Sequence, residues 1–286
     1  MSELKGWLNL NKEKGITSHD LVSKVRKKLK IKRVGHAGTL DPMATGVMVI
    51  AVGQATRLIQ FLQETKTYKA EVYLGITTDT LDAEGKILSE NQVNVTQEQI
   101  HQAIKKYIGK IKQIPPMVSA IHHEGVRLYE LARQGIEVER KSRDIEIYNI
   151  TISEINLPKF TIEVSCQSGT YIRTLADDIG RDLGCGAHLS KLERTEANKI
   201  FARQNSLEVD DITPETLIPF DLPVRYLPEI SLDDELAKKY LQGQKINITN
   251  KNDTYRVTNN NSLIGIAKLN DNLLKPEVNF VFTDKN

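Results

Sequence analysis

The sequence predicts an α/β protein of the α+β kind, with one large mixed domain and a small β domain at its C-terminal end. The chain has 286 residues, which suits one large and one small domain at roughly 100 to 200 residues per domain. Helical and strand periodicities are mixed before residue 224, and mainly strand patterns follow it. Between them lies an acidic stretch, 208–235, whose prolines interrupt helices and central strands. We therefore expect a linker there, and domains of 1–224 and 225–286.

The first predicted elements are a helix, a buried strand and a second helix. The first helix begins at Ser18 or His19 and runs to about Lys30, because its apolar residues fall on one side and its lysines around the rest. The run Val47–Val52 is short and continuously apolar, which is typical of a buried strand. Residues 54–63 then have the apolar spacing of a helix.

The remaining elements of the large domain are of both types. Thr96 and Gln99 have the spacing of a capping box, which predicts a helix through Tyr107. A further helix is expected at 172–183, since it is preceded by Ser-Gly-Thr and followed by Gly184. Alternation of apolar and polar residues predicts three strands, at 68–75, 145–155 and 160–166.

The tail has the pattern of a small β domain. A short helix is expected at 236–241. Three asparagines at 259–261 form a turn signal between two of the predicted strands. The strands are expected at 255–258, 263–269 and 278–282.

The composition excludes several classes of protein. Hydrophobic residues make up 40% and charged residues 27%, as in folded globular proteins rather than disordered ones. The longest apolar run, Val47–Val52, is far shorter than the ~20 residues that a membrane-spanning helix needs. No secretory signal pattern opens the chain, and the two cysteines, Cys166 and Cys185, are expected to be buried free thiols. We therefore expect a cytoplasmic protein that does not enter a membrane.

Charge is distributed unevenly along the chain. The net charge is only +2, but residues 1–60 contain eleven Lys or Arg against four Asp or Glu. Seven of the eleven lie between Lys24 and Arg33, which predicts a basic face suited to a polyanion. The stretch 208–235 has the opposite bias, with nine acids against one base.

The loop GHAGTLDPMATG, residues 35–46, is the densest cluster of candidate functional residues. Its glycines allow a backbone to pass close to a ligand, and Asp41 lies in its middle. On its own, an Asp-Pro pair usually only starts a turn. The loop lacks the lysine of a phosphate-binding P-loop, and Met43 stands where a magnesium-dependent phosphotransferase would have a second carboxylate.

This loop resembles the catalytic signature of the TruB family of tRNA pseudouridine synthases, which isomerise uridine 55 in the T loop of tRNA. Three later segments resemble further family blocks in the same order: KTYKAEVYLGITTDTLDAEG, IPPMVSAIHHEGVRLYELAR and GTYIRTLADDIGRDLGCGAHLSKLERT. The resemblance implies the pseudouridine synthase fold, with a mixed and mainly antiparallel sheet. The tail from Leu227 resembles, more loosely, the PUA-like RNA-binding domain of the family.

The resemblance also implies roles for single residues. Asp41 is the expected nucleophile, and Arg173 is expected to pair with it and to lower its pKa. Tyr68 is expected to stack on the target base and is a candidate proton acceptor. Further expected substrate-binding residues are His36, Tyr171, Leu192 and Lys12. The expected partner is the tRNA T stem-loop, bound by a monomer without metal or other cofactor, because isomerisation conserves all atoms.

The sequence departs from the family pattern at a few positions. Asn11 and Glu13 stand where the N-terminal segment of the family has Asp and Pro. Val118 stands where a tyrosine is usual after Pro-Pro, and His122 where a lysine is usual. These departures concern the N-terminal strand and the Pro-Pro loop, and they leave the nucleophile intact.

Two other functions stay open at the level of sequence. A tRNA-binding folding chaperone, with secondary or lost catalysis, would explain the basic helix but not the set Asp41, Tyr68 and Arg173. A small-molecule glycosidase would need a second carboxylate near Asp41, and only Asp79 or Asp82, in a turn-like segment, could supply it. For the isomerase, three routes are possible: attack of Asp41 at C1′, attack at C6, or abstraction of the C2′ proton.

Overall fold

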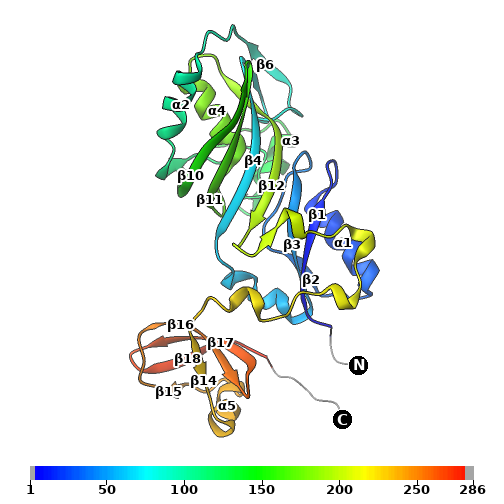
Figure 1. Ribbon diagram of the computed structural model, residues 1–286, viewed down its shortest axis with the longest axis vertical. Helices are drawn as coiled ribbons and strands as arrows, with labels where there is room; N and C mark the ends of the chain where they lie inside the picture. Colours follow the sequence, from blue (N-terminus) through cyan, green and yellow to red (C-terminus); the bar gives the residue numbers. More distant parts are fainter. Residues whose placement is uncertain (1–3, 281–286) are drawn as a thin grey trace.

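A nine-stranded sheet forms the centre of the large domain in the computed structural model, which describes residues 4–280 (Figure 1). Its main path runs β1-β3-β12-β4-β11-β10-β7, with β2 paired to β3 and β13 paired to β12. All neighbours are antiparallel except β3 and β12, so the predicted mixed, mainly antiparallel sheet is confirmed. The strands are β1 (Gly6–Lys12), β2 (Val34–His36), β3 (Thr45–Val52), β4 (Thr65–Leu74), β7 (Gly109–Gln113), β10 (Arg143–Asn156), β11 (Lys159–Gln167), β12 (Ala187–Ala197) and β13 (Phe201–Ala202).

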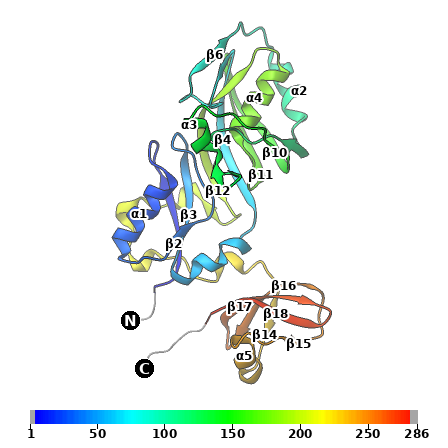
Figure 2. The same cartoon turned by 180° about the vertical axis from the view of Figure 1, so that it is seen from behind.

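Two of the predicted helices cover one end of this sheet. Helices α2 (Gln97–Lys105) and α4 (Ile172–Asp182) lie side by side there, with α2 against β10 and α4 against β12 and β4 (Figure 2). Helix α1 (Ser18–Leu29) lies at the other end, near β2. Both α1 and α2 begin with the capping box that their sequences favour, at Thr17 and Thr96 respectively.

Short elements complete the large domain. The hairpin β5 (Ile76–Thr78) and β6 (Ile87–Glu90) follows β4, and a smaller one, β8 (His122–His123) and β9 (Val126–Arg127), precedes helix α3 (Leu128–Arg133). The segment predicted as a helix at 54–63 is a 3₁₀-helix, η1 (Gly53–Phe61). Apolar residues spaced three apart fit either type of helix, so the periodicity could not distinguish them.

The tail is a small β domain with one helix, as expected, and it has five strands where three were predicted. Its strand order is β14-β16-β17-β18-β15. Asn260 and Asn261 adopt left-handed conformations in the turn between β16 and β17, as asparagine tolerates. The elements are β14 (Glu229–Ser231), α5 (Asp234–Leu241), β15 (Ile246–Asn247), β16 (Asp253–Asn259), β17 (Ser262–Asn270) and β18 (Leu273–Asn279).

The last strand differs from the prediction of 278–282. It begins at Leu273 and contains Pro276. A proline within a run argues against assigning that run as a central strand from sequence. A register shift between Ile266 and Ala267 of the partner strand accommodates the proline. Residues 281 and 282 lie outside the described part of the chain.

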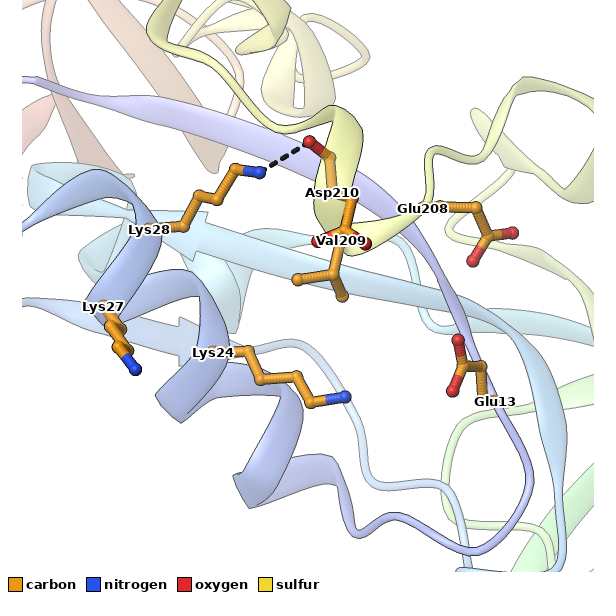
Figure 3. Close-up of a pocket in the computed structure, with 7 residues that line it drawn as sticks. All are labelled: Glu13, Lys24, Lys27, Lys28, Glu208, Val209 and Asp210. Carbon is orange, nitrogen blue, oxygen red and sulfur yellow. Dashed lines mark hydrogen bonds between the residues drawn. The ribbon is translucent and has the colours of Figure 1, made fainter.

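The acidic segment after residue 206 is not a free linker as predicted. Short 3₁₀ turns carry it along β1, where backbone hydrogen bonds join Trp7 to Ile218 and Leu207 to Asn9 and Asn11. Its acidic part also approaches the basic helix: Lys28 donates to the carbonyl of Asp210 (Figure 3). The 3₁₀ turns of this segment are η3 (Val209–Asp211), η4 (Pro214–Thr216) and η5 (Leu222–Val224), and η2 (Arg203–Asn205) precedes them. Proline excludes long helices here, but it does not prevent packing.

A shared apolar cluster connects the tail to the large domain. Trp7 is fully buried, and its indole nitrogen donates to the carbonyl of Phe220 at 2.9 Å. Phe220 meets Phe280 edge to face, with ring centroids 4.8 Å apart. Arg57 donates to the carbonyl of Asn279 and lies over the Phe280 ring. The two parts therefore bury side chains against each other.

Candidate active site

The loop 37–44 presents Asp41 between strands β2 and β3. The loop turns back at Asp41, whose carbonyl accepts from the amide of Ala44 at 3.0 Å. The Asp41 side chain is 35% exposed, whereas its neighbours Leu40 and Met43 are buried. The carboxylate is therefore the accessible group of an otherwise packed loop.

Arg173 joins this loop to two other segments. It lies in the first turn of α4, with its side chain only 3% exposed, and its Nε contacts Asp41 Oδ2 at 2.9 Å. Its two Nη atoms donate to the carbonyls of Thr80 at 3.1 Å and Val118 at 2.7 Å. Asp82 Oδ2 lies 3.6 Å from Nη1. The predicted pairing of Asp41 with Arg173 is thus present in the structure, and the guanidinium is fixed on three sides.

The departure at Val118 does not disturb this arrangement. Arg173 donates to the Val118 carbonyl, a backbone group that every residue type offers. The N-terminal strand also forms over its full length despite its departures, with the Asn11 amide donating to Glu208 at 2.7 Å.

The net effect on the Asp41 carboxyl differs from the sequence expectation. Burial raises the pKa of Asp41 above its ordinary value, and the nearby Asp82 carboxylate adds to this rise. Arg173 opposes it by favouring the charged form, as expected, but does not outweigh the loss of hydration. Asp41 is therefore a more basic carboxylate than a solvated aspartate.

Tyr68 and Leu192 lie on adjacent central strands. Tyr68 on β4 and Leu192 on β12 are 9% and 7% exposed, and both belong to the main apolar core. Burial raises the pKa of the Tyr68 phenol, so it is protonated at neutral pH. That state favours a stacking or hydrogen-donating role over the role of a base.

His36 and Tyr171 lie at the ends of their elements and are half-buried. His36 ends β2, and burial followed by the nearby Arg194 lowers the pKa of its imidazole. Its Nδ1 is buried without a hydrogen-bond partner among residues 4–280, which leaves one polar atom for a ligand. Tyr171 precedes α4, where Gln113 bonds both its amide and its carbonyl.

Lys12 is a buried lysine that donates to the Asp41 loop. It is fully buried, and its Nζ donates to the carbonyls of Glu13 at 2.9 Å, Pro42 at 3.2 Å and Ala44 at 2.7 Å. Burial lowers the pKa of Lys12 to about 8. These hydrogen bonds support the Asp41 loop, and a contact of Lys12 with the substrate stays a prediction.

Three residues near the site were not predicted as part of it. Asp82 forms the predicted turn, since Oδ1 accepts from Thr80 and the amide of Glu84, but its second oxygen faces Arg173. Arg194 and Lys66 are buried cations that donate to carbonyls of the Asp41 loop. Asp82 and Lys66 occur in the block around KTYKA and Arg194 in the block ending LERT, but nothing in the sequence shows which atoms they contact.

The described residues contain no group of three His, Cys, Asp or Glu side chains that could hold a metal ion. Cys166 and Cys185 are buried free thiols, as predicted. Arg173 pairs with both Asp41 and Asp82, so the two carboxylates share one cation.

The arrangement provides a partly exposed carboxylate whose orientation is fixed by a buried guanidinium. Such a group can attack an electrophilic carbon or remove a proton from carbon. Tyr68 on β4 can supply an aromatic surface for a base.

Three family models match successive parts of the chain. Residues 26–172 match the N-terminal domain of the TruB family pseudouridylate synthases, residues 173–218 the tRNA pseudouridylate synthase B C-terminal domain, and residues 228–278 the C-terminal region of pseudouridine synthase II TruB. A tRNA pseudouridine synthase B of Syntrophomonas wolfei is 43% identical, covering 96% of this chain and 97% of its own. One of Alkaliphilus oremlandii is 45% identical, covering 85% of this chain and 83% of its own.

A solved structure has the same fold. A chain in the crystal structure of a Cbf5-Nop10-Gar1 complex superposes with a TM-score of 0.74 at 25% identity, over 97% of this chain and 84% of that one. The family match covers the Asp41 loop and continues through Arg173. The chain therefore belongs to the TruB family of pseudouridylate synthases.

Proposed function

We propose that the protein is a tRNA pseudouridine synthase that converts uridine 55 of the T loop, with Asp41 as the nucleophile. The observation that carries the proposal is the Asp41 carboxylate, 35% exposed and held at 2.9 Å by Arg173. The name shared by the relatives, tRNA pseudouridine synthase B, supports tRNA as the substrate. It does not favour a chaperone without catalysis.

The proposed reaction uses few protein groups. The N1–C1′ bond of the uridine breaks, the uracil turns, and C5 bonds to C1′, while the C5 proton leaves and N1 receives one. Asp41 serves as nucleophile or base in each of the three possible routes. Its raised pKa makes it a better proton acceptor while Arg173 fixes its direction. Stacking on Tyr68 would offset part of the few kcal/mol needed to flip the base out of the loop.

The remaining expectations belong to the same proposal. We infer a cytoplasmic monomer that binds the T stem-loop and needs no cofactor, with a catalytic domain of 1–224 and a PUA-like domain of 225–286. The five-stranded sheet of the tail supports the second domain. His36 and Tyr171 are proposed to contact the RNA, and Leu192 to line the pocket for the base. Separately, no helix among residues 4–280 is long and apolar enough to cross a membrane.

Mass mapping of pseudouridine in a T stem-loop oligonucleotide tests the proposal. Wild type should convert the target uridine without added cofactor, and Asp41→Asn should abolish conversion while leaving RNA binding within about threefold. Asp144→Asn, which changes a carboxylate that is 83% exposed on β10, is the matched control and should retain full conversion. Conversion by Asp41→Asn would refute the role of Asp41. Salt-dependent binding by wild type without any pseudouridine would instead support the chaperone.

A further inference from the structure

Lys66 and Arg194 are two buried cations behind the Asp41 loop. They project from adjacent strands, β4 and β12, and are 3% and 1% exposed. Neither forms an ion pair with a carboxylate anywhere in residues 4–280. A buried charge is costly unless other polar groups replace its hydration. The polar groups that replace the hydration of Lys66 and Arg194 therefore indicate what these two residues do.

The replacing groups are mainly carbonyls of the Asp41 loop. Lys66 Nζ donates to the carbonyl of Ala37 at 3.2 Å. Arg194 donates to the next two carbonyls, from Nη2 to Gly38 at 3.2 Å and from Nη1 to Thr39 at 3.3 Å. Three successive peptide groups before Asp41 are thus oriented by two cations. Arg194 also donates from Nε to the carbonyl of Val47 at 2.7 Å, which ties the loop to β3.

The Lys66 ammonium is itself held in place. Its second hydrogen bond goes to Oδ1 of Asn198 at 2.9 Å, and Asn198 in turn donates to the carbonyl of Gln63. Gly38 has a φ of +120°, a conformation that favours glycine, and a Cβ there would be in ordinary van der Waals contact, 3.7 Å from Lys66 Cε and from Arg194 Nη1. The hydrogen bonds of Lys66 therefore join the loop to Asn198 and, through it, to Gln63.

We propose that Lys66 is a positioning residue for pseudouridine formation, acting with Arg194 to hold the Asp41 loop in its reactive geometry. The inference rests on the proposed function. Lys66 has no contact with Asp41 itself and acts through the Ala37 carbonyl. A displacement of a reacting group by about 1 Å can slow a reaction by about 100-fold. Loss of the clamp should therefore slow the chemical step and leave RNA binding largely unchanged.

The charge of Lys66 gives the proposal a pH signature. Burial, followed by repulsion from Arg194, lowers the pKa of Lys66 to about 7. Of the other groups around it, Cys166 on β11 stays a neutral thiol because burial raises its pKa to about 12, and His36 is neutral above its lowered pKa. Hydrogen bonds from a charged donor are roughly twice as strong as neutral ones. The loop should therefore be held less firmly as Lys66 loses its proton.

Three variants test the clamp in the full-length protein. Lys66→Met removes the charge at similar length, and Lys66→Arg makes it permanent, with a neighbouring hollow of about 210 Å³ to receive the longer side chain. Lys69→Met, on the exposed face of the same strand, is the control. The measurements are the single-turnover rate of pseudouridine formation on a T stem-loop from pH 6 to 9, the Kd for that RNA, and the melting temperature.

Lys66→Met should lower the single-turnover rate about 100-fold at pH 6.5 and change the Kd by less than threefold. Lys66→Arg should recover most of the rate and move the basic limb of the pH profile from about 7 towards about 8, where Lys12 titrates. Lys69→Met should match wild type.

Two results would overturn the proposal. The first is a wild-type rate in Lys66→Met. The second is a basic limb in Lys66→Arg that stays at the wild-type pH, and this measurement decides the matter even if Lys66→Met fails to fold. Absence of pseudouridine with wild type would contradict the proposed function instead, so the two failures are distinguishable.

Discussion

Arg173→Lys is the substitution that tests the site geometry most directly. Lysine keeps the positive charge but has one nitrogen, whereas Arg173 uses three nitrogens to reach Asp41 and the carbonyls of Thr80 and Val118. An ammonium has three donor hydrogens, but its single nitrogen cannot occupy the positions of all three guanidinium nitrogens, so we expect at least two of these contacts to be lost. A hydrogen bond that involves a charged group contributes about 1.5–3 kcal/mol, so the loss is about 3–6 kcal/mol. Because such terms are not additive, the lower end is expected, which corresponds to a rate reduced at least ~100-fold.

The pH profile of this variant should change in a defined direction. Asp41 must be ionised to act as nucleophile, so activity falls as the pH falls through its pKa. Arg173 opposes the rise in the pKa of Asp41, and weakening that contact should move the acidic limb to higher pH.

The assay for Arg173→Lys is the single-turnover rate of pseudouridine formation against pH, with the Kd for RNA measured beside it. Arg181→Lys, on the same helix with a side chain 72% exposed, is the control and should behave as wild type. A rate for Arg173→Lys within threefold of wild type, or an unchanged acidic limb, would refute this account of the site.

Two further substitutions test the packing of the tail and of the Asp41 loop. Phe280→Ala should lower the free energy of unfolding in urea by about 3–4 kcal/mol, because the ring is 1% exposed and meets Phe220 edge to face. Leu157→Ala, 44% exposed, should change it by less than about 0.5 kcal/mol, and an equal effect of the two would contradict the shared cluster. Gly46→Ala should reduce both stability and activity, since a Cβ there would lie 2.3 Å from the Arg194 carbonyl. Gly15→Ala has a similar positive φ but open space, so it isolates the cost of backbone strain, about 1–3 kcal/mol.

Elements with a clear local pattern were predictable from the sequence, and those whose pattern is broken by buried polar residues were not. The helices at 18–29 and 172–182 follow from apolar spacing and end signals. Strand β12 lies in the middle of the sheet but was not predicted, because Arg194 occupies an inward position where alternation calls for an apolar residue. Strand β12 is buried because it lies between β3 and β4, and a single sequence does not show which strands pair.

The sequence likewise predicted some features of the candidate site and missed others. Asp41 and Arg173 were predicted as a pair from the resemblance to a family, and the structure places them 2.9 Å apart. The direction of the Asp41 pKa was wrong, because burial cannot be read from neighbouring residue types. Lys12 was predicted to bind the substrate, and in the structure its ammonium donates to three backbone carbonyls, those of Glu13, Pro42 and Ala44. Contacts of a side chain with a backbone carbonyl far away in the sequence leave no mark in a local sequence pattern.

The position of Asp41 depends on residues distributed over most of the large domain. A loop is normally more mobile than the strands it joins, whereas a nucleophile needs a fixed direction. Here Lys12, Lys66 and Arg194 bind loop carbonyls on both sides of Asp41, and Ser18 bonds both the amide and the carbonyl of Leu40. Because β12 supplies Arg194 and also pairs with β3 at Gly46, the contacts of Arg194 with the loop form only when β12 has docked. We therefore expect efficient pseudouridine formation to need the chain folded through at least residue 197, although the nucleophile lies at residue 41.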